Sequence, residues 1–353
     1  RNVVRYAAVA DEVEVPGSGL ICLGSFAFAD MPGDSVLTVP KVVVGRRGDR
    51  CWVTTIGASA DDVPDLDVQP LPAAPVNLAF ADGARSGADW EGVVWEAVLH
   101  LNAGELDKVV LARDLVATSD APIDVRWPLR RLGSEYEMCW TFHVDRLFGA
   151  TPELLVRREK GLVTSRVLAG TIRRTGDDEH DLTLAATLAR SSKDLEEHEY
   201  AVRSVADALA PYCSSMNVPE APFVLHLPNV MHLATDVAGV AHNGGASVLD
   251  LAAALHPSAA VGGTPTKLAV EMIAEIEGMD RGRYAGPVGW MNAHGDGEFG
   301  IALRSAEIEP TTDGTGRVRL FAGCGIVADS DPESELAESQ AKFVPVRNAL
   351  AEG

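Results

Sequence analysis

The sequence predicts an α+β protein in which paired antiparallel strands are layered with helices. Short apolar runs recur along the chain, and turn-forming residues join several of them directly. His294–Gly297 and Asp313–Gly314 are such turns, and a short turn of this kind brings its two strands together as an antiparallel hairpin. The regular strand–helix alternation of a Rossmann fold is absent, which favours the α+β arrangement.

The expected strands are distributed over most of the chain. In chain order they cover residues 42–44, 51–56, 108–116, 138–144, 153–157, 162–168, 223–227, 285–291, 299–307 and 318–321. Strands that follow one another so closely are expected to form sheets with mostly antiparallel neighbours.

Helical periodicity marks the segments between these strands. The expected helices cover residues 89–102, 192–210, 247–255, 266–277 and 332–351. The last has the clearest signature, because Asp331 is a suitable N-cap and Pro332 suits the first helical position. Leu336, Phe343 and Leu350 are spaced seven residues apart, so one face of this helix is expected to be buried.

One segment has the composition of a linker. Residues 58–89 are rich in Ala, Asp and Pro, but apolar patterning resumes on both sides. An exposed connection inside one folded unit is therefore favoured over a domain boundary. We expect a single domain over residues 1–353, with the distinctive motifs in 86–353 and a less distinctive part in 1–85.

Composition limits the classes of partner. The chain has 51 Asp and Glu against 30 Lys and Arg, a net charge of −21, which argues against nucleic acid or an anionic membrane as partner. The sequence contains no run of about 18 apolar residues, so no membrane-spanning helix is predicted. The first residues lack the apolar core of a secretion signal. The five cysteines form no CxxC pair, which favours a reducing cytoplasm.

Several familiar motifs are incomplete or missing. Gly262–Lys267 ends like a phosphate-binding loop, but its lysine follows a threonine instead of a glycine. We interpret it as a glycine turn that leads into a helix. His226 and His232 form no zinc motif, and the sequence has no GxSxG elbow of a hydrolase.

Two acidic helix faces are more informative. Asp194 and Glu197 are three residues apart in one expected helix, and Glu335 and Glu338 have the same spacing in another, with Lys342 one turn later. Spacing alone favours solvated helix faces, and Asp194 also fits a capping box. If the two faces meet, their carboxylates require a hard divalent cation such as Mg²⁺ between them.

Lysine is scarce, with six residues against 24 arginines. Lysine differs from arginine in that burial can remove its proton, so a retained lysine is a candidate base. Lys108 begins an expected strand and is the best such candidate. An ordinary lysine at the edge of a strand is the alternative.

Seven motifs, taken in order, resemble those of the chorismate-utilising enzymes, and most closely the isochorismate synthases among them. The resemblance covers residues 85–350. The motifs are 108–113 (KVVLAR), 150–155 (ATPELL), 168–171 (LAGT), 193–198 (KDLEEH), 255–265 (LHPSAAVGGTP), 301–305 (IALRS) and 323–342 (GCGIVADSDPESELAESQAK).

The resemblance implies two antiparallel sheets packed face to face, flanked by helices, with the active site in the central cleft. It implies Mg²⁺ held by Glu197 and Glu338, with Asp194 and Glu335 reaching the ion through water. This interpretation replaces that of two separate solvated faces.

Two positions indicate which nucleophile is added. Relatives that add ammonia carry glutamine in place of Lys108 or lysine in place of Ala169, and they draw ammonia from a glutamine amidotransferase. Lys108 together with Ala169 therefore implies water as the nucleophile, no such partner subunit, and by default a monomer. Salicylate synthases also keep the first lysine, but the segment from His256 to Gly263 resembles the type that makes only isochorismate. A protein that binds chorismate or metal without catalysis is the third alternative.

The reaction this implies adds water at C2 of chorismate and expels the C4 hydroxyl. We assign Lys108 as the base that activates water and Glu153 as the acid that protonates the leaving hydroxyl, which requires opposite pKa shifts. The remaining substrate-binding residues are expected to hold the carboxylates and to line the ring. They are Gly170, Thr171, His256, Arg304, Gly323, Cys324, Gly325 and Lys342.

Overall fold

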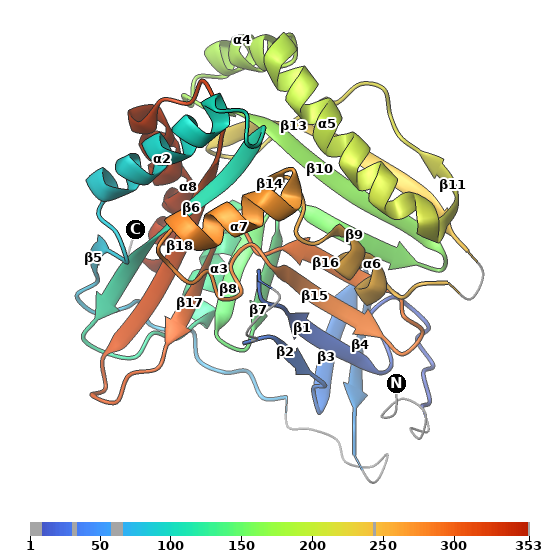
Figure 1. Ribbon diagram of the computed structural model, residues 1–353. Helices are drawn as coiled ribbons and strands as arrows, with labels where there is room; N and C mark the ends of the chain where they lie inside the picture. The colour runs from blue at the N-terminus through green and yellow to red at the C-terminus, as the bar shows by residue number, and fades with distance from the viewer. Residues whose placement is uncertain (1–8, 30–33, 58–65, 243–244, 352–353) are drawn as a thin grey trace.

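Two large antiparallel sheets and one small hairpin form the framework (Figure 1). The computed structural model describes residues 9–29, 34–57, 66–242 and 245–351, without the side chains of residues 193 and 197. Within this part of the chain, every strand pairing is antiparallel. The predicted fold class is confirmed.

The first sheet contains nine strands. In spatial order they are β11 (Cys213–Asn217), β13 (Val230–Ala241), β10 (Leu162–Arg173), β9 (Leu154–Glu159), β16 (Gly297–Ile301), β15 (Pro287–Asn292), β1 (Ile21–Ser25) and β2 (Val36–Thr38), while β12 (Phe223–His226) also pairs with β13. The β15–β16 turn is the hairpin predicted at residues 294–297.

The second sheet contains seven strands. Their order is β14 (Gly263–Thr264), β6 (Lys108–Ser119), β18 (Gly316–Ile326), β17 (Ser305–Glu309), β8 (Leu147–Thr151) and β7 (Trp140–Val144), and β5 (Ala79–Asp82) pairs with β6. The β17–β18 connection is the second predicted hairpin. A separate two-stranded sheet joins β3 (Val42–Arg47) to β4 (Arg50–Thr55).

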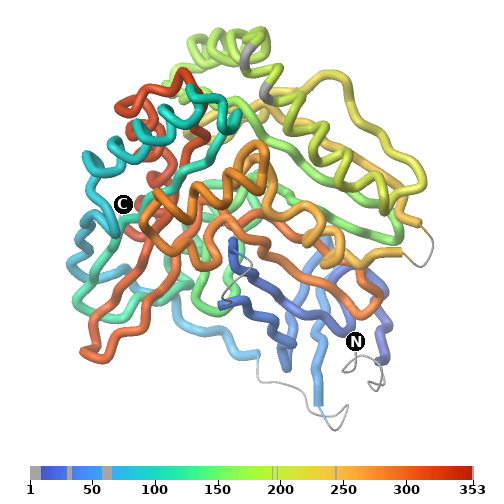
Figure 2. Tube along the Cα trace, viewed as in Figure 1, coloured from blue at the N-terminus to red at the C-terminus, as the bar shows by residue number. Residues whose placement is uncertain are grey.

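Helices cover the outer faces of the sheets. They are α2 (Gly87–Asn102), α3 (Arg126–Glu135), α4 (Asp178–Leu188), α5 (Ser192–Leu209), α6 (Val248–Leu255), α7 (Thr266–Ile276) and α8 (Pro332–Leu350), with a short 3-10 turn at Ala210–Tyr212. α5 packs along β10 and β13, and α8 packs on β18. Figure 2 shows α2 and α8, which are distant in the sequence, lying side by side.

Helix starts follow the local sequence. The Asp331 carboxylate accepts a hydrogen bond from the Ser334 backbone N–H at 2.9 Å, and Pro332 takes the first turn of α8, as predicted. Phe343 and Leu350 are buried, while Leu336 is partly buried. No helix of the described residues has the length and apolar character needed to cross a membrane.

The main core joins both sheets. Leu111 and Ile326 from the seven-stranded sheet and Val156 and Phe299 from the nine-stranded sheet belong to one buried cluster, together with Val94 of α2. Burial of side chains of this size contributes about 1.5–3 kcal/mol each. The two sheets are therefore held against each other by shared apolar packing.

The chain crosses from one sheet to the other at two neighbouring points. Glu153 lies between β8 and β9, and Arg304 lies between β16 and β17. The Ile301 backbone N–H donates to the Glu153 carbonyl at 3.1 Å, and the Ala150 N–H donates to the Arg304 carbonyl at 3.2 Å. The two crossovers thus fix each other at the junction of the sheets.

This junction corrects one sequence prediction. A single strand over residues 299–307 was expected, but the strand stops after Ile301 and resumes at Ser305 in the other sheet. Arg304 has φ +48, a left-handed conformation that interrupts an extended run. Arg304 is therefore presented by a crossover and not by a strand.

The other predicted helices and strands agree in part with the structure. The five expected helices are present, but α3 and α4 were missed, as was the long strand β13. In the linker-like segment, residues 58–65 lie outside the described part, while Ala79–Asp82 form β5 and the last residues begin α2. The assignment of the whole chain to one domain stays a prediction.

Candidate active site

A cavity of about 480 Å³ opens where the two sheets meet. Its walls come from β6, β10, β13, β18, α5, α8 and the two crossovers. Most of the predicted site residues line it, namely Lys108, Glu153, Gly170, Thr171, Asp194, Arg304, Gly323, Gly325, Glu335, Glu338 and Lys342. Motifs from distant parts of the sequence are thus brought to one place.

Three predicted residues are placed differently. Cys324 is buried behind the wall formed by its neighbours Gly323 and Gly325, and His256 is not among the residues described as lining the cavity. The His256 Nε2 lies 2.9 Å from the Phe28 carbonyl oxygen, and its ring packs edge-on against Phe28. The side chain of Glu197 lies outside the described part of the structure, so its expected role stays a prediction.

One end of the cavity is acidic and ion-paired. The Lys342 Nζ lies 2.6 Å from the Glu338 Oε1 and also donates to the Gly323 carbonyl at 2.9 Å. Burial alone raises the pKa of Glu338, but Lys342, together with Arg304 and Lys108, lowers it overall. Burial likewise opposes the charge of Lys342, yet Cys324 and Glu338 raise the pKa of the amine overall. Both groups are held in their charged forms.

Glu335 and Asp194 extend this acidic end. The Ser330 hydroxyl donates to the Glu335 Oε1 at 2.7 Å, which orients that carboxylate. Ser191 is the N-cap of α5, as in the capping box that the sequence allows with Asp194, because the Ser191 hydroxyl accepts from the Asp194 backbone N–H at 3.3 Å. The Asp194 side chain is directed to the cavity.

Gly170 allows Asp194 to approach β10. The pairing of β10 with β13 shifts register between Ala169 and Thr171, and Gly170 has φ +76. A Cβ atom at this position would lie 3.3 Å from the Asp194 Oδ1. Glycine is thus required for both the left-handed backbone and the close approach.

The candidate acid and base line the same cavity. Glu153 is 6% exposed, and burial raises its pKa to about 7, although Arg304, Lys108 and Lys342 oppose the shift. Lys108 begins β6, and its side chain lies against Gly325 of β18, whose register partner in β6 is Val110. A Cβ on Gly325 would lie 2.7 Å from the Lys108 Cε, so this glycine makes room for the amine.

A match to the sequence model of one protein family covers nearly the whole chain and decides the family. A model described as "Chorismate binding enzyme" matches residues 1–351. The chain belongs to the chorismate-binding enzyme family.

Its relatives include biosynthetic enzymes of known name. The chain is 39% identical to isochorismate synthase MenF of Bacillus subtilis over 74% of this chain and 55% of that protein. It is 40% identical to isochorismate synthase DhbC of the same species, over 74% of this chain and 67% of that protein. The chain therefore spans only about half the length of the first of these relatives.

A solved structure supports the same fold. The menaquinone-specific isochorismate synthase MenF from Escherichia coli superposes with a TM-score of 0.80 at 27% identity, covering 94% of this chain and 79% of that one. The sequence resemblance to this family is thereby confirmed.

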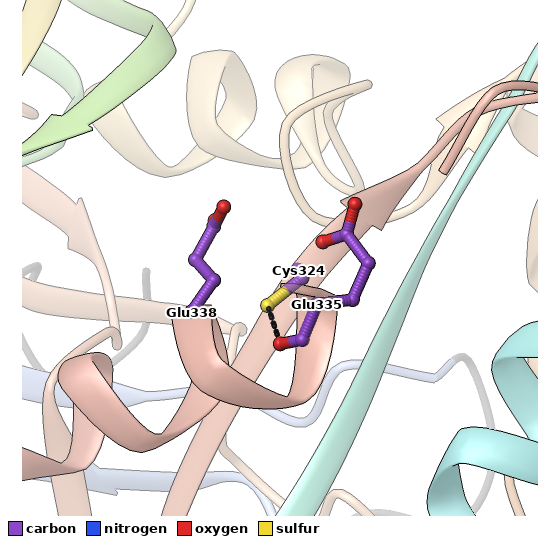
Figure 3. Close-up of side chains that lie close together, drawn as sticks. All are labelled: Cys324, Glu335 and Glu338. Atoms are coloured by element: carbon purple, nitrogen blue, oxygen red, sulfur yellow. Dashed lines mark hydrogen bonds between the residues drawn. The ribbon is translucent and has the colours of Figure 1, made fainter. Parts of the chain in front are cut away.

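The carboxylates of this chorismate-binding enzyme suit a hard cation. Carboxylate oxygens of Glu335 and Glu338 point in the same direction from α8 (Figure 3), and Asp194 lines the cavity from α5. Oxygen-rich sites of this kind fit Mg²⁺. The donor set of the described residues is therefore compatible with the metal that the sequence predicted.

His232 is a cavity residue that the sequence analysis set aside. Its Nδ1 lies 3.0 Å from the Thr171 hydroxyl, while its buried Nε2 has no hydrogen-bond partner among the described residues. Burial, together with Arg304 and Lys342, lowers its pKa to about 3, so the ring is neutral. Alternation along β13 could have identified this inward position, but that strand was not predicted.

A second group of residues, which the sequence analysis did not identify, supports the cavity wall behind Lys108. Arg281 lies on the Phe28 ring and pairs with Glu277 at 2.5 Å, and both side chains are almost fully buried. The same guanidinium donates to the carbonyls of Val110 and Val261 at 2.6 and 2.9 Å. It therefore ties β6 to the segment that carries the glycine turn.

That turn is structural. Gly263–Thr264 form β14, which pairs with Val109 and Lys108 of β6. Lys267 is 88% exposed, and its amine reaches only to Glu271, 4.0 Å away. The interpretation of residues 262–267 as a turn into a helix is confirmed. Through the pairing of β14 with β6, the segment also helps to fix the backbone position of Lys108.

Proposed function

We propose that this chain is an isochorismate synthase, which converts chorismate and water to isochorismate with Mg²⁺. The observation that carries the proposal is the buried Glu153, a carboxyl that keeps its proton near neutral pH in the same cavity as Lys108. Exchange of hydroxyl groups needs one group that gives a proton and one that takes a proton. Membership of the chorismate-binding family supplies the substrate class.

Lys108 and Glu153 carry the two proton transfers. Lys108 takes a proton from water as its oxygen forms the bond to C2. The ring double bonds then shift, and the C4–oxygen bond breaks. Glu153 donates its proton to the departing hydroxyl, which leaves as water. Desolvation favours the protonated Glu153, because a buried carboxylate loses its hydration.

The substrate carboxylates require positive partners. Arg304 lines the cavity, and its guanidinium makes no hydrogen bond or ion pair with the described residues. Its N–H groups are therefore available to donate two parallel hydrogen bonds to the enolpyruvyl carboxylate. β17 pairs with β18 only as far as Leu320, which leaves backbone groups of residues 321–326 on that edge for the same anion.

Thr171 and Gly170 line the cavity and would contact the ring of the substrate. Glu197 and Glu338, with Asp194 and Glu335 through water, would hold Mg²⁺. When bound, the ion supplies positive charge that orients the ring carboxylate and withdraws electrons from the diene. Lys342 limits the negative charge of these carboxylates.

Product analysis tests the proposal directly. Purified protein is incubated with chorismate and Mg²⁺, and the products are separated by chromatography. Isochorismate as the sole product is expected. Salicylate with pyruvate would indicate a salicylate synthase, a requirement for ammonia would indicate an amine-adding enzyme, and binding without product would indicate a non-catalytic protein. Any of these three results would contradict the proposal.

Lys108→Gln is the matching variant. We expect loss of isochorismate formation without a change in folding, because glutamine cannot accept the proton. Lys267→Gln is the control, since that lysine is exposed and is not among the residues described as lining the cavity. Chelation by EDTA should also stop turnover, and added Mg²⁺ should restore it.

A further inference from the structure

A second, much smaller cavity adjoins the active-site cavity at Glu153. It measures about 20 Å³, and Glu153 and Ala260 line both cavities. Its other walls come from β9, β10, α5, the end of β16 and the turn that follows Pro257. The candidate acid therefore borders two spaces, one that suits a substrate and one that is enclosed within the wall.

The small cavity is lined by a hydroxyl group that lacks a partner. The Ser258 Oγ is buried and has no hydrogen-bond partner among the described residues. Glu153 is 6% exposed, and its carboxyl makes no hydrogen bond with the described residues either. Buried polar groups are unfavourable unless something bonds to them. Two such groups thus border the same small space.

The backbone fixes both groups in place. The Ser258 carbonyl accepts from the N–H groups of Val261 and Gly262 at 3.1 and 2.9 Å, which closes the turn. The Glu153 backbone N–H donates to the Thr151 hydroxyl at 3.2 Å. Because both side chains start from hydrogen-bonded backbone, the space between them is a constant feature of the wall.

The size and lining of this space suit one water molecule. An ordered water needs about 10–15 Å³ and two to four polar partners. The cavity provides about 20 Å³, which is too small for a metabolite. Ser258 and Glu153 supply two partners, and Ser165, which is 3% exposed, lines the same cavity.

We propose that this cavity holds one water molecule, which hydrogen-bonds to the Ser258 hydroxyl and the Glu153 carboxyl and returns a proton to Glu153 after each turnover. Ser258 is a positioning residue, because it acts on the reaction only through this water. The water site stands by itself, whereas its part in turnover rests on the proposed function.

The proton balance of the reaction requires such a return. Glu153 gives its proton to the C4 hydroxyl, which leaves as water, and Lys108 has taken a proton from the attacking water. Before the next turnover Lys108 loses its extra proton to solvent and Glu153 gains one from solvent, so no net proton is consumed.

The small cavity offers a route for that proton which does not cross the substrate. Ser204 of α5 is exposed and lines the small cavity, so this cavity leads from Glu153 toward solvent on the α5 side. The held water passes one of its protons to the Glu153 carboxylate and takes another from solvent. Glu153 can thus be reprotonated while product still fills the large cavity.

A high-resolution crystal structure of the wild-type chain tests the site without any assay. We expect density for a water at about 2.6–3.2 Å from both the Ser258 Oγ and a carboxyl oxygen of Glu153. The water should remain in Ser258→Thr and be lost in Ser258→Val. The wild-type density needs no variant, so the site can be judged even if a substitution disturbs folding.

The same two variants test the role in turnover, because threonine and valine have the same shape and differ in the hydroxyl. Ser258→Val should lower kcat by at least about tenfold, with little change in KM, because Glu153 is reprotonated more slowly. Ser258→Thr should recover most of that loss. Mn²⁺, which replaces Mg²⁺ and is followed by electron paramagnetic resonance, should bind both variants as it binds wild type.

Infrared spectroscopy provides a readout that a purely structural role would not change. The C=O stretch of protonated Glu153, identified as the band missing from Glu153→Gln, should move to higher frequency in Ser258→Val and stay in place in Ser258→Thr. Ser214→Val is the matched control, because Ser214 is exposed on β11 and is not among the residues described as lining either cavity.

Density that shows no water here, or a water bonded to only one of the two groups, would overturn the site. Equal losses of kcat in Ser258→Thr and Ser258→Val would overturn the return of the proton, because the hydroxyl would then not matter. If the protein makes no isochorismate, the density and the infrared band still decide whether the water site exists.

Discussion

Glu153 and Glu338 are the same residue type in one cavity, and their proton affinities are shifted in opposite directions. Glu153 with Lys108 is called the proton-donating end below, and Glu338 with Lys342 the metal-binding end. Glu153 is 6% exposed and makes no side-chain hydrogen bond or ion pair with the described residues, and its pKa rises to about 7. Glu338 is in contact with the Lys342 amine at 2.6 Å, and its pKa falls despite burial.

The difference shows what a contacting cation adds: Lys342, together with Arg304 and Lys108, lowers the pKa of Glu338 despite its burial. Arg304, Lys108 and Lys342 all lower the pKa of Glu153, but together they do not overcome its desolvation. One carboxyl is thus suited to the proposed role of proton donor, and the other to that of an anion. The two ends of the cavity are chemically distinct although both contain glutamate and lysine.

The largest expected effect is at the proton-donating end. Glu153→Gln should lower kcat by about 10²–10⁴-fold, because glutamine keeps the shape but cannot donate the proton. Mn²⁺ binding should change less than twofold, since the metal-binding carboxylates are untouched. The measurement is isochorismate formation beside a Mn²⁺ titration, with the exposed Glu275→Gln as control. Turnover within tenfold of wild type would remove Glu153 from its role.

Glu338→Gln should give the opposite pattern. Loss of one carboxylate is expected to weaken Mn²⁺ binding by at least tenfold, and turnover at low Mg²⁺ should fall with it. High Mg²⁺ should restore part of the activity, because the proton-transfer groups are intact. If Glu338→Gln and Glu153→Gln gave identical profiles of activity against Mg²⁺, the division between the two ends would be wrong.

The sequence predicts the composition of both ends but not their difference. The spacing of Glu335 and Glu338, and of Lys342 one turn later, follows from helical periodicity alone. The pKa of Glu153 depends on its burial at a crossover between two sheets, which no local pattern specifies. Arg304 illustrates the same limit, since an apolar run that reads as one strand is divided by a left-handed residue.

Other parts of the site were missed for the same reason. His232 belongs to β13, whose pairing with β10 comes from contacts far apart in sequence. Arg281 and Glu277 are an ordinary i,i+4 pair in the sequence, and only the structure shows them buried behind β6. The roles assigned to individual residues stay predictions until the variants are measured.

The pH dependence should follow the proton-donating end. With its pKa near 7, Glu153 is increasingly ionised above that pH, so kcat/KM should fall up to tenfold per pH unit on the alkaline side. The measurement is a profile of kcat/KM from pH 5 to 9. An alkaline fall with the same midpoint in Glu153→Gln would show that another group causes it.

Folding stability provides an independent check on the same group. The native carboxyl stays protonated up to about pH 7, whereas the unfolded chain ionises from about 4.5. The contribution of Glu153 to the free energy of unfolding is therefore fully present below pH 4.5. It falls by about 3 kcal/mol as the pH rises to about 7. In urea unfolding, Glu153→Gln should lack this part of the pH dependence.

The smallest expected effect lies between the two ends, at the glycine that gives Lys108 its space. A Cβ on Gly325 would lie 2.7 Å from the Lys108 Cε and 3.2 Å from the Nζ, so Gly325→Ala should push the amine out of position. Because a flexible side chain can move, we expect about a tenfold loss of kcat with folding and Mn²⁺ binding intact. Gly92→Ala is the control, since nothing lies within 4 Å of a Cβ there. Unchanged kcat in Gly325→Ala would mean that the position of the Lys108 amine is not set by this contact, and weaker Mn²⁺ binding would mean that the two ends are coupled through β18.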